Sequence, residues 1–396
     1  MKKLFQAKNL TMLCFLLLLG LLFQRGVPHV CRGFASAIHQ YKLTGTVDFS
    51  IVEEEYNQNF SAKYHFINLN GAYQKLMGAK VVNERYLLDN GHLTYVIGEY
   101  DMEGIARNTV DFRNALSALD IPMFYVNAPF KIHRTHKQLP KNAQDYSNEN
   151  ADCFLACLRE ENVPVLDLRE RIDAESLDHY GMFYKSDHHW TTEAALWAAG
   201  EITEYLSGWD PNYAVPQGIL DPSGYTYEVY EDIFLGSAGK RVGGLYSGMD
   251  DYTVITPAYD TAFTFSAENG AIIREGSFSD AFLIRENLYP EDPLSSNVYQ
   301  TYCGNGYGQM RILNHSADAC SPKKILLIRD SFSDVLAPFL SLGYTRLDVL
   351  DLRSFHGDVL DYVRQTAPDA VLVVYNPGAY ENNNLVMFDF LTVPET

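Results

Sequence analysis

Basic residues are scarce in this chain. It carries 31 lysines and arginines against 50 aspartates and glutamates, which gives a formal net charge of -19 at pH 7. A surface of this sign repels phosphate backbones and anionic lipid headgroups. The composition therefore argues against nucleic acid as a partner.

Cysteine is also scarce, with six residues in 396. Cys153 and Cys157 are four positions apart on a predicted helix, and Cys303 and Cys320 flank a polar loop that a disulfide could close. Their spacing is not that of a zinc site, and spacing alone does not establish a disulfide. Six cysteines suit an exported protein without defining a disulfide scaffold.

Long hydrophobic runs are absent except near the N-terminus, where LTMLCFLLLLGLLF occupies residues 10–23 behind three lysines. This arrangement matches a secretory signal, with Ala35-Ser36-Ala37 as the expected cleavage site. The alternative is an uncleaved membrane anchor, although a full span needs about 20 apolar residues. Both alternatives place the chain after residue 40 outside the cytoplasm, either secreted or anchored to the cell membrane.

The chain has ample material for a core, because 47% of its 396 residues are hydrophobic and 13% are aromatic. Short apolar runs alternate with stretches of helical spacing, which predicts α/β structure. Strands that are apolar on both faces and separated by helices form a parallel sheet with helices on both faces. The expected strands cover 93–100, 121–130, 163–169, 323–330, 346–352 and 370–376.

Composition divides the chain into regions. The segment 1–40 is the signal or anchor, and 41–90 is a polar N-terminal region without recognisable chemistry. An α/β catalytic domain is expected over 91–385, followed by a C-terminal tail at 386–396. Residues 208–322 interrupt the alternation with turn residues and short pieces rich in tyrosine and threonine, which predicts a β-rich insertion.

The run Asp187-His188-His189-Trp190 places two of only 11 histidines side by side. In an extended loop Asp187 and His189 can point the same way, so that the carboxylate holds Nδ1–H while Nε2 faces a hydroxyl. A metal site formed by the Asp-His-His run, with His356 as a further ligand, is the alternative. Adjacent histidines on a strand point to opposite faces, which counts against that site.

Ser331 follows the expected strand 323–330 and begins a helix. At that place a hydroxyl meets the positive end of the helix, and nearby backbone N–H groups can stabilise an oxyanion. The alternative is that Ser331 or Ser333 only caps the helix. Serine is a weak nucleophile and needs a base, and His189 is the candidate.

The strings SDHHW at 186–190 and IRDSFSDVLAPFL at 328–340 resemble the DHHW family of bacterial exported proteins. That family is similar to the SGNH-like acetyltransferase domains of the alginate O-acetylation proteins, and the resemblance covers roughly residues 80–385. It implies an SGNH-hydrolase-like fold, with Ser331 as nucleophile, His189 as general base and Asp187 as its orienting carboxylate.

The resemblance also suggests roles around this triad. His188, at the variable position of D-x-H, is expected to line the substrate pocket or to pack in place. Trp190 is expected to support the loop or to contact a sugar ring. Asn376, after the last strand, is a candidate for substrate binding as an oxyanion donor.

Two features depart from the pattern. Arg329 stands where a glycine is expected before the Asp-Ser pair, which puts the close backbone approach of that turn in doubt. The Asp-His element also precedes the serine, an order that differs from ordinary SGNH esterases but agrees with the alginate-acetylation branch.

The sequence thus predicts an exported serine O-acetyltransferase that modifies a cell-surface or secreted polysaccharide through an acetyl-serine intermediate, with no metal or bound cofactor required. The resemblance implies a membrane-bound O-acyltransferase as the partner that supplies the acetyl group. Two alternatives remain: a carbohydrate acetylesterase with the same triad, and a non-catalytic glycan-binding or scaffold protein whose tyrosine-rich insertion forms the contact surface.

Overall fold

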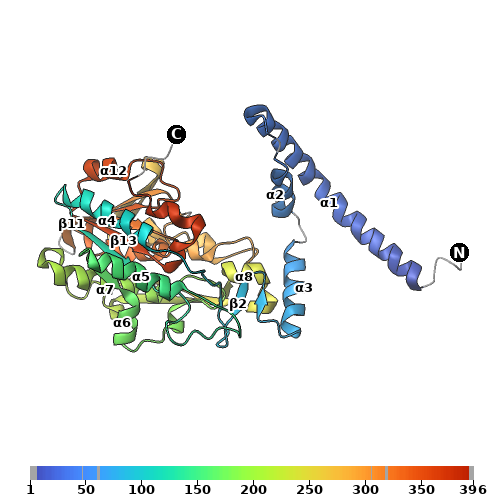
Figure 1. The fold of residues 1–396 in the computed structure, drawn as a ribbon, viewed down its shortest axis with the longest axis horizontal. Coiled ribbons are helices and arrows are strands. Elements are labelled where there is room, and N and C mark those ends of the chain that lie inside the picture. The colour runs from blue at the N-terminus through green and yellow to red at the C-terminus, as the bar shows by residue number, and fades with distance from the viewer. Residues whose placement is uncertain (1–6, 47, 60–62, 305, 317–319, 392–396) are drawn as a thin grey trace. The chain divides into compact units, whose positions relative to one another are not determined.

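The computed structural model describes residues 7–46, 48–59, 63–304, 306–316 and 320–391 (Figure 1). The chain forms two compact units, Met1–Met77 and Gly78–Thr396. The second unit begins earlier than the boundary expected at residue 91, because the strands β1 (Val81–Val82) and β2 (Arg85–Leu87) belong to it.

The first unit is helical. It consists of α1 (Ala7–Thr44), α2 (Ser50–Asn59) and α3 (Lys63–Leu76). A Cβ atom on Gly33 of α1 would lie 2.7 Å from the Cα of Val52, so the glycine permits close packing of α2 on α1. Within the described part of the chain, no helix combines the length and apolar character needed to cross a membrane. Cleavage at Ala35-Ser36-Ala37 stays a prediction.

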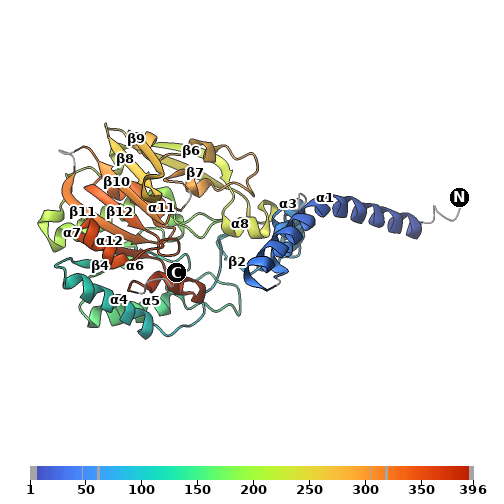
Figure 2. The same cartoon turned by 90° about the horizontal axis from the view of Figure 1, so that it is seen from above.

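The second unit contains an eight-stranded sheet in the order β5-β4-β13-β11-β12-β10-β8-β9 (Figure 2). The strands from β5 to β12 pair in parallel, and β10, β8 and β9 extend them antiparallel. The α/β fold with a mostly parallel sheet is therefore confirmed. The bounds are β4 (Met123–Asn127), β5 (Val165–Asp167), β8 (Phe263–Ala267), β9 (Ile272–Gly276), β10 (Gln309–Asn314), β11 (Ser321–Arg329), β12 (Tyr344–Leu350) and β13 (Ala370–Tyr375).

Helices cover both faces of the parallel part of this sheet. Alternate residues of each strand enter two cores, so that Phe124 packs with α7 (Thr192–Trp209) and α11 (Ser333–Ser341), while Tyr125 faces the opposite layer. That layer contains α4 (Glu103–Ser117), α5 (Ser147–Glu160) and α12 (Val359–Thr366). The remaining helices are α6 (Leu168–Ala174), α8 (Ser237–Val242), α9 (Gly244–Ser247) and α10 (Phe278–Phe282).

Two expected elements differ from the structure. The strand predicted at 93–100 shortens to β3 (Leu93–Thr94), which pairs with β2 in a separate three-stranded sheet, because β13 already occupies the edge of β4. The stretch 208–322 is rich in strands as predicted, but it does not fold as a separate unit. It supplies β8, β9 and β10 to the main sheet, and β6 (Tyr225–Phe234) and β7 (Asp250–Pro257) to a two-stranded ribbon.

Arg329 is the last residue of β11 and is fully buried. Its guanidinium lies 2.7 Å from the carboxylate of Asp334 on α11 and 3.6 Å from that of Asp351, which follows β12. The arginine in place of the expected glycine therefore ties the ends of two neighbouring strands to the helix behind Ser331. Removing one partner of such a buried ion pair leaves the other charge buried and uncompensated, which destabilises the fold.

We expect Arg329→Ala to lower the free energy of unfolding by about 3–5 kcal/mol, because the buried Asp334 carboxylate loses its counter-charge, while Asp351 keeps Arg353. Arg364→Ala is the matched control, since Arg364 is 54% exposed where it pairs with Asp361, and its loss should cost about 1 kcal/mol or less. Urea unfolding of both variants measures the difference. Arg329→Lys, which keeps the charge, should lie between them, and equal stability of all variants would contradict the role of Arg329.

Candidate active site

The Ser331 hydroxyl faces His189 across the carboxyl end of the parallel strands. Ser331 Oγ lies 2.7 Å from His189 Nε2, although 142 positions separate the two residues in the chain. The helix α11 has Phe332 at its N-cap position and no side-chain cap, so the alternative that Ser331 or Ser333 caps it is wrong. The half-buried Ser331 hydroxyl is engaged by a base instead.

The other ring nitrogen of His189 is held by Asp187. Nδ1 of His189 lies 2.5 Å from Oδ1 of Asp187, and the backbone N–H of His189 donates to the same oxygen at 2.9 Å. The second carboxylate oxygen accepts from the N–H of Ser237 at the start of α8. A Cβ on Gly236 would lie 2.2 Å from the Cβ of Asp187, so this approach of α8 requires a glycine.

The charge on Asp187 fixes the tautomer of His189. Burial by itself raises the pKa of the Asp187 carboxyl, but His189 and the hydrogen bonds from His189 and Ser237 outweigh burial and hold that pKa well below its usual range. An ionised carboxylate only accepts hydrogen bonds, so Nδ1 carries the proton and Nε2 accepts from Ser331. The three residues form a serine, base and carboxylate relay of the kind that activates hydroxyl nucleophiles.

Two aromatic residues support this arrangement. The ring of Tyr299 stacks on that of His189 with centroids 3.9 Å apart and an interplanar angle of 13°. The indole N–H of Trp190 and the hydroxyl of Tyr299 both donate to the carbonyl of Phe332, the residue after the serine. Trp190 is completely buried, so it supports the loop and has no face left for a sugar. Sequence reasoning missed Tyr299 because it lies in the irregular insertion.

His188 does not point away from His189, as a strand would require. The two ring centroids are 3.8 Å apart, because the segment is a loop rather than a strand. Nδ1 of His188 lies 2.8 Å from the hydroxyl of Ser237. Asp187, His188 and His189 each offer one ligand atom, and these three atoms lie within 4.8 Å of one another. The metal alternative therefore still has these three ligands, but His356 is not among the group.

Lys131 anchors the loop from behind. Its side chain is almost completely buried, and its ammonium donates to the carbonyls of Leu93, Lys185 and Asp187. These bonds join β3 to the loop that carries the Asp-His element. No sequence pattern singles out this lysine, because its partners are backbone atoms.

Asp330 organises the turn that holds Ser331. One oxygen accepts from the N–H of Phe332 at 2.9 Å, and the other accepts from the backbone and side-chain nitrogens of Asn376 at 2.7 and 2.6 Å. The side-chain oxygen of Asn376 accepts from the N–H of Gly378. Asn376 is thus the structural partner of Asp330, and no hydrogen bond of the described residues links it to the triad as an oxyanion donor.

A cavity of about 650 Å³ adjoins the triad through His188 and Ser237. Arg85 and Arg241 line it together with Glu84, Glu381 and Tyr95. Arg85 lies 5.5 Å from the centroid of the Tyr95 ring, and the edge of Tyr95 contacts His188. A cavity of this size with a few convergent polar groups suits a small ligand or part of a chain.

The two cysteines around the polar loop do not form a disulfide. Cys303 and Cys320 are both free and buried. Burial raises the pKa of the Cys303 thiol to about 12, so this thiol stays protonated and unreactive at neutral pH.

Comparison with known proteins identifies the domain to which the Asp-His loop belongs. The family model of an SGNH hydrolase-like domain, acetyltransferase AlgX, matches residues 94–216, a stretch that contains Asp187 and His189 but ends before Ser331. No curated protein matches the chain. The resemblance to SGNH-like acetyltransferase domains is therefore confirmed for this stretch.

Solved structures extend the likeness to most of the chain. PatB1 of Bacillus cereus, in a structure with a sulfonyl adduct, superimposes with a TM-score of 0.63 at 20% identity, covering 78% of this chain and 100% of that one. A DHHW family protein of Eubacterium siraeum gives a TM-score of 0.60 at 17% identity over 80% of this chain and 98% of that one. At such identities the likeness describes the fold.

The pKa of His188 is lowered to about 3, first by burial and then by the neighbouring His189. The folded protein therefore keeps His188 neutral at pH values where the unfolded chain, with a pKa near 6.5, binds a proton. Stability should fall as the pH drops from about 6.5 toward 3, and this part of the fall should vanish in His188→Gln.

Urea unfolding at several pH values measures this effect. The slope due to His188 should stay below the limit of about 1.4 kcal/mol per pH unit for one group, because 27% of the side chain is exposed. His356→Gln, at an exposed position, is the control and should leave the slope unchanged. Identical slopes in the wild type and in His188→Gln would refute the neutral state.

Proposed function

We propose that this chain is an exported serine O-acetyltransferase that modifies a polysaccharide through an acetyl-Ser331 intermediate. The observation that carries the proposal is the contact of 2.7 Å between Ser331 Oγ and His189 Nε2, with Asp187 behind the ring at 2.5 Å. The family match to an SGNH-like acetyltransferase domain supports acyl transfer as the class of reaction.

In the first half-reaction, His189 Nε2 takes the proton of Ser331 as Oγ attacks the acetyl carbonyl of a donor ester. The tetrahedral intermediate collapses when the bond to the donor oxygen breaks, and His189 returns the proton to that leaving oxygen. The products are the acetyl ester of Ser331 and the free alcohol of the donor. Asp187 stabilises the imidazolium while it carries the proton.

In the second half-reaction, a sugar hydroxyl loses its proton to His189 and attacks the acetyl-serine carbonyl. Ser331 leaves with the proton from His189, and the sugar keeps the acetyl group. No hydrogen bond of the described residues uses the backbone N–H of Ser331. This N–H lies ahead of α11, so it supports the oxyanion together with the positive end of the helix.

The donor and the acceptor complete the proposal. If the segment 1–40 directs export, acetyl-CoA of the cytoplasm does not reach Ser331, and a membrane-bound O-acyltransferase supplies the acetyl group. The acceptor approaches through the cavity beside His188, where Arg85, Arg241 and the two glutamates provide donors and acceptors for sugar hydroxyls. If water enters in place of the sugar, the same residues hydrolyse acetyl esters.

Cleavage of 4-nitrophenyl acetate by the full chain tests the nucleophile. We expect Ser331→Ala to lower the rate by at least about 10³-fold, because the triad acts as a unit. Ser333→Ala is the matched control, since its buried hydroxyl lies two positions along and has no partner among the described residues. A sulfonyl fluoride should label Ser331, as mapped by peptide mass spectrometry.

Retention of full activity and of labelling in Ser331→Ala would overturn the proposal. Loss of activity on removal of a metal ion, measured together with the metal content, would favour the metal alternative at the Asp-His-His run. Product analysis with cellohexaose present separates the two acyl acceptors. A transferase gives acetylated sugar, whereas an esterase gives acetate whether or not the sugar is there.

The cavity beside His188 predicts a separate effect on the acceptor. Arg85→Ala and Arg241→Ala should each raise KM for cellohexaose about tenfold, because each removes hydrogen bonds from a charged donor. Cleavage of 4-nitrophenyl acetate, which is too small to reach both arginines, should change less than about twofold. Lys141→Ala, at an exposed position, is the control. An unchanged KM in both arginine variants would place the acceptor elsewhere.

A further inference from the structure

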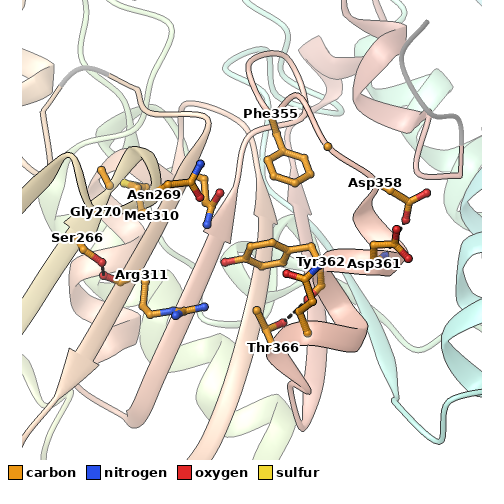
Figure 3. A pocket seen from close by; sticks show the side chains of 14 residues that line it. Ser266, Asn269, Gly270, Met310, Arg311, Phe355, Asp358, Asp361, Tyr362 and Thr366 are labelled. Atoms are coloured by element: carbon orange, nitrogen blue, oxygen red, sulfur yellow. Dashed lines mark hydrogen bonds between the residues drawn. The ribbon is translucent and has the colours of Figure 1, made fainter. Parts of the chain in front are cut away.

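A second cavity, of about 750 Å³, lies on the opposite side of β12 from β11 and contains no residue of the triad (Figure 3). Its walls come from β8, the short 3-10 helix η4 (Glu268–Gly270), β10, the loop after β12, and α12. We call it the β10–α12 cavity. Nothing in the proposed reaction uses it.

The cavity exists because the antiparallel part of the sheet is covered on one face only. Along β10 and β8 buried residues alternate with partly exposed ones. The buried residues pack in the core with α11, while Ser266, Gln309 and Arg311 project to the other face. Ser266 and Arg311 lie on the wall opposite Tyr362 and Thr366 of α12 (Figure 3).

An aromatic ring forms the rim. Phe355 is half-buried and meets the edge of Tyr362 with ring centroids 5.7 Å apart. The N–H of Phe355 donates to the carbonyl of Asp351, which fixes the loop. A Cβ on Gly357 would lie 2.7 Å from the Phe355 ring, so the glycine allows the ring its position over the cavity (Figure 3).

The polar lining suits uncharged hydroxyl groups. The amides of Asn269, Gln309 and Gln365 each offer donors and an acceptor. The carboxylate of Asp348 lies 2.7 Å from Arg311 and 2.6 Å from Arg346. The lining adds the carboxylates of Asp358 and Asp361, and Asp361 is paired with Arg364 at 2.6 Å. Amides beside an aromatic face match the polar edge and apolar face of a neutral sugar. The three carboxylates and the three arginines paired around them balance in charge, so the site has no excess positive charge to attract an anion.

The Phe355 end of the cavity lies at the same edge of the sheet as the triad. The strands β11 and β12 are parallel neighbours, so Ser331 and the loop that carries Phe355 both follow carboxyl ends. Asp351, at the start of that loop, contacts the buried Arg329, two positions before Ser331. A polymer that lies along this edge can contact both sites.

We propose that the β10–α12 cavity is a second glycan site, which binds neutral sugar units of the polysaccharide whose hydroxyl is acetylated at Ser331. This assignment rests on the proposed function. Binding at the second site converts the encounter of the polymer with Ser331 into an intramolecular event and so raises its effective concentration. Long acceptors benefit from it, and small esters do not.

Binding of cellohexaose to the full chain tests the site by calorimetry, in the Ser331→Ala background where no transfer occurs. Phe355→Ala combined with Gln365→Ala should weaken binding at least about tenfold, because the stacking face and one amide are lost. Gly357→Ala keeps every lining side chain but displaces the Phe355 ring, and it should also weaken binding. His356→Ala, next to the ring and exposed, is the matched control and should bind normally.

Failure of the second glycan site can be distinguished from failure of the proposed acetyl transfer at Ser331. With an active serine, Phe355→Ala combined with Gln365→Ala should cleave 4-nitrophenyl acetate at the normal rate while its kcat/KM for long acceptors falls at least fivefold. Loss of ester cleavage in Ser331→Ala supports the proposed reaction whether or not the sugar binds at the second site. Absence of binding, binding that the Phe355 and Gly357 variants leave unchanged, or tighter binding of hexagalacturonate than of cellohexaose overturns the second site.

Discussion

The Asp187 carboxylate is the contact on which the site depends. One oxygen holds the ring and the backbone of His189, and the other accepts from Ser237, so a single side chain joins the Asp-His loop to α8. The free-energy cost of burying this charge is offset by His189 and by the N–H donors around the carboxylate. Because the carboxylate stays ionised, it orients the imidazole toward Ser331. The neighbouring Gly236 leaves the space that this approach needs.

Around this pair, buried polar residues hold three chain segments in register. Lys131 ties the Asp-His loop to β3 through backbone carbonyls, and Asp330 ties the Ser331 turn to Asn376 after β13. Arg329 joins the ends of β11 and β12 to α11. Lys131 and Asp330 bind groups that are remote in sequence, whereas Arg329 pairs with Asp334 five positions along the chain as well as with Asp351. The position of the serine hydroxyl is thus fixed by a connected polar layer at the carboxyl edge of the sheet.

Much of the fold was predictable because strands buried on both faces and amphipathic helices leave strong periodic signals. Five of the six expected parallel strands occur as β4, β5, β11, β12 and β13. The sixth, at 93–100, was wrong because an apolar run does not reveal which edge it pairs with, and β3 joined β2 instead. The insertion was predicted as β-rich, but its union with the main sheet depends on long-range pairing of β10 with β12.

The sequence by itself singled out the candidate catalytic residues: Asp187 and His189 at a spacing of two, and Ser331 between a strand and a helix. Only the tertiary structure decided that these two segments meet at 2.7 Å, that Trp190 is buried, and that His188 lies beside His189. It also revealed Tyr299, Lys131 and the β10–α12 cavity. Local patterns report periodicity and turn chemistry, whereas contacts between residues over a hundred positions apart depend on how the sheet is assembled.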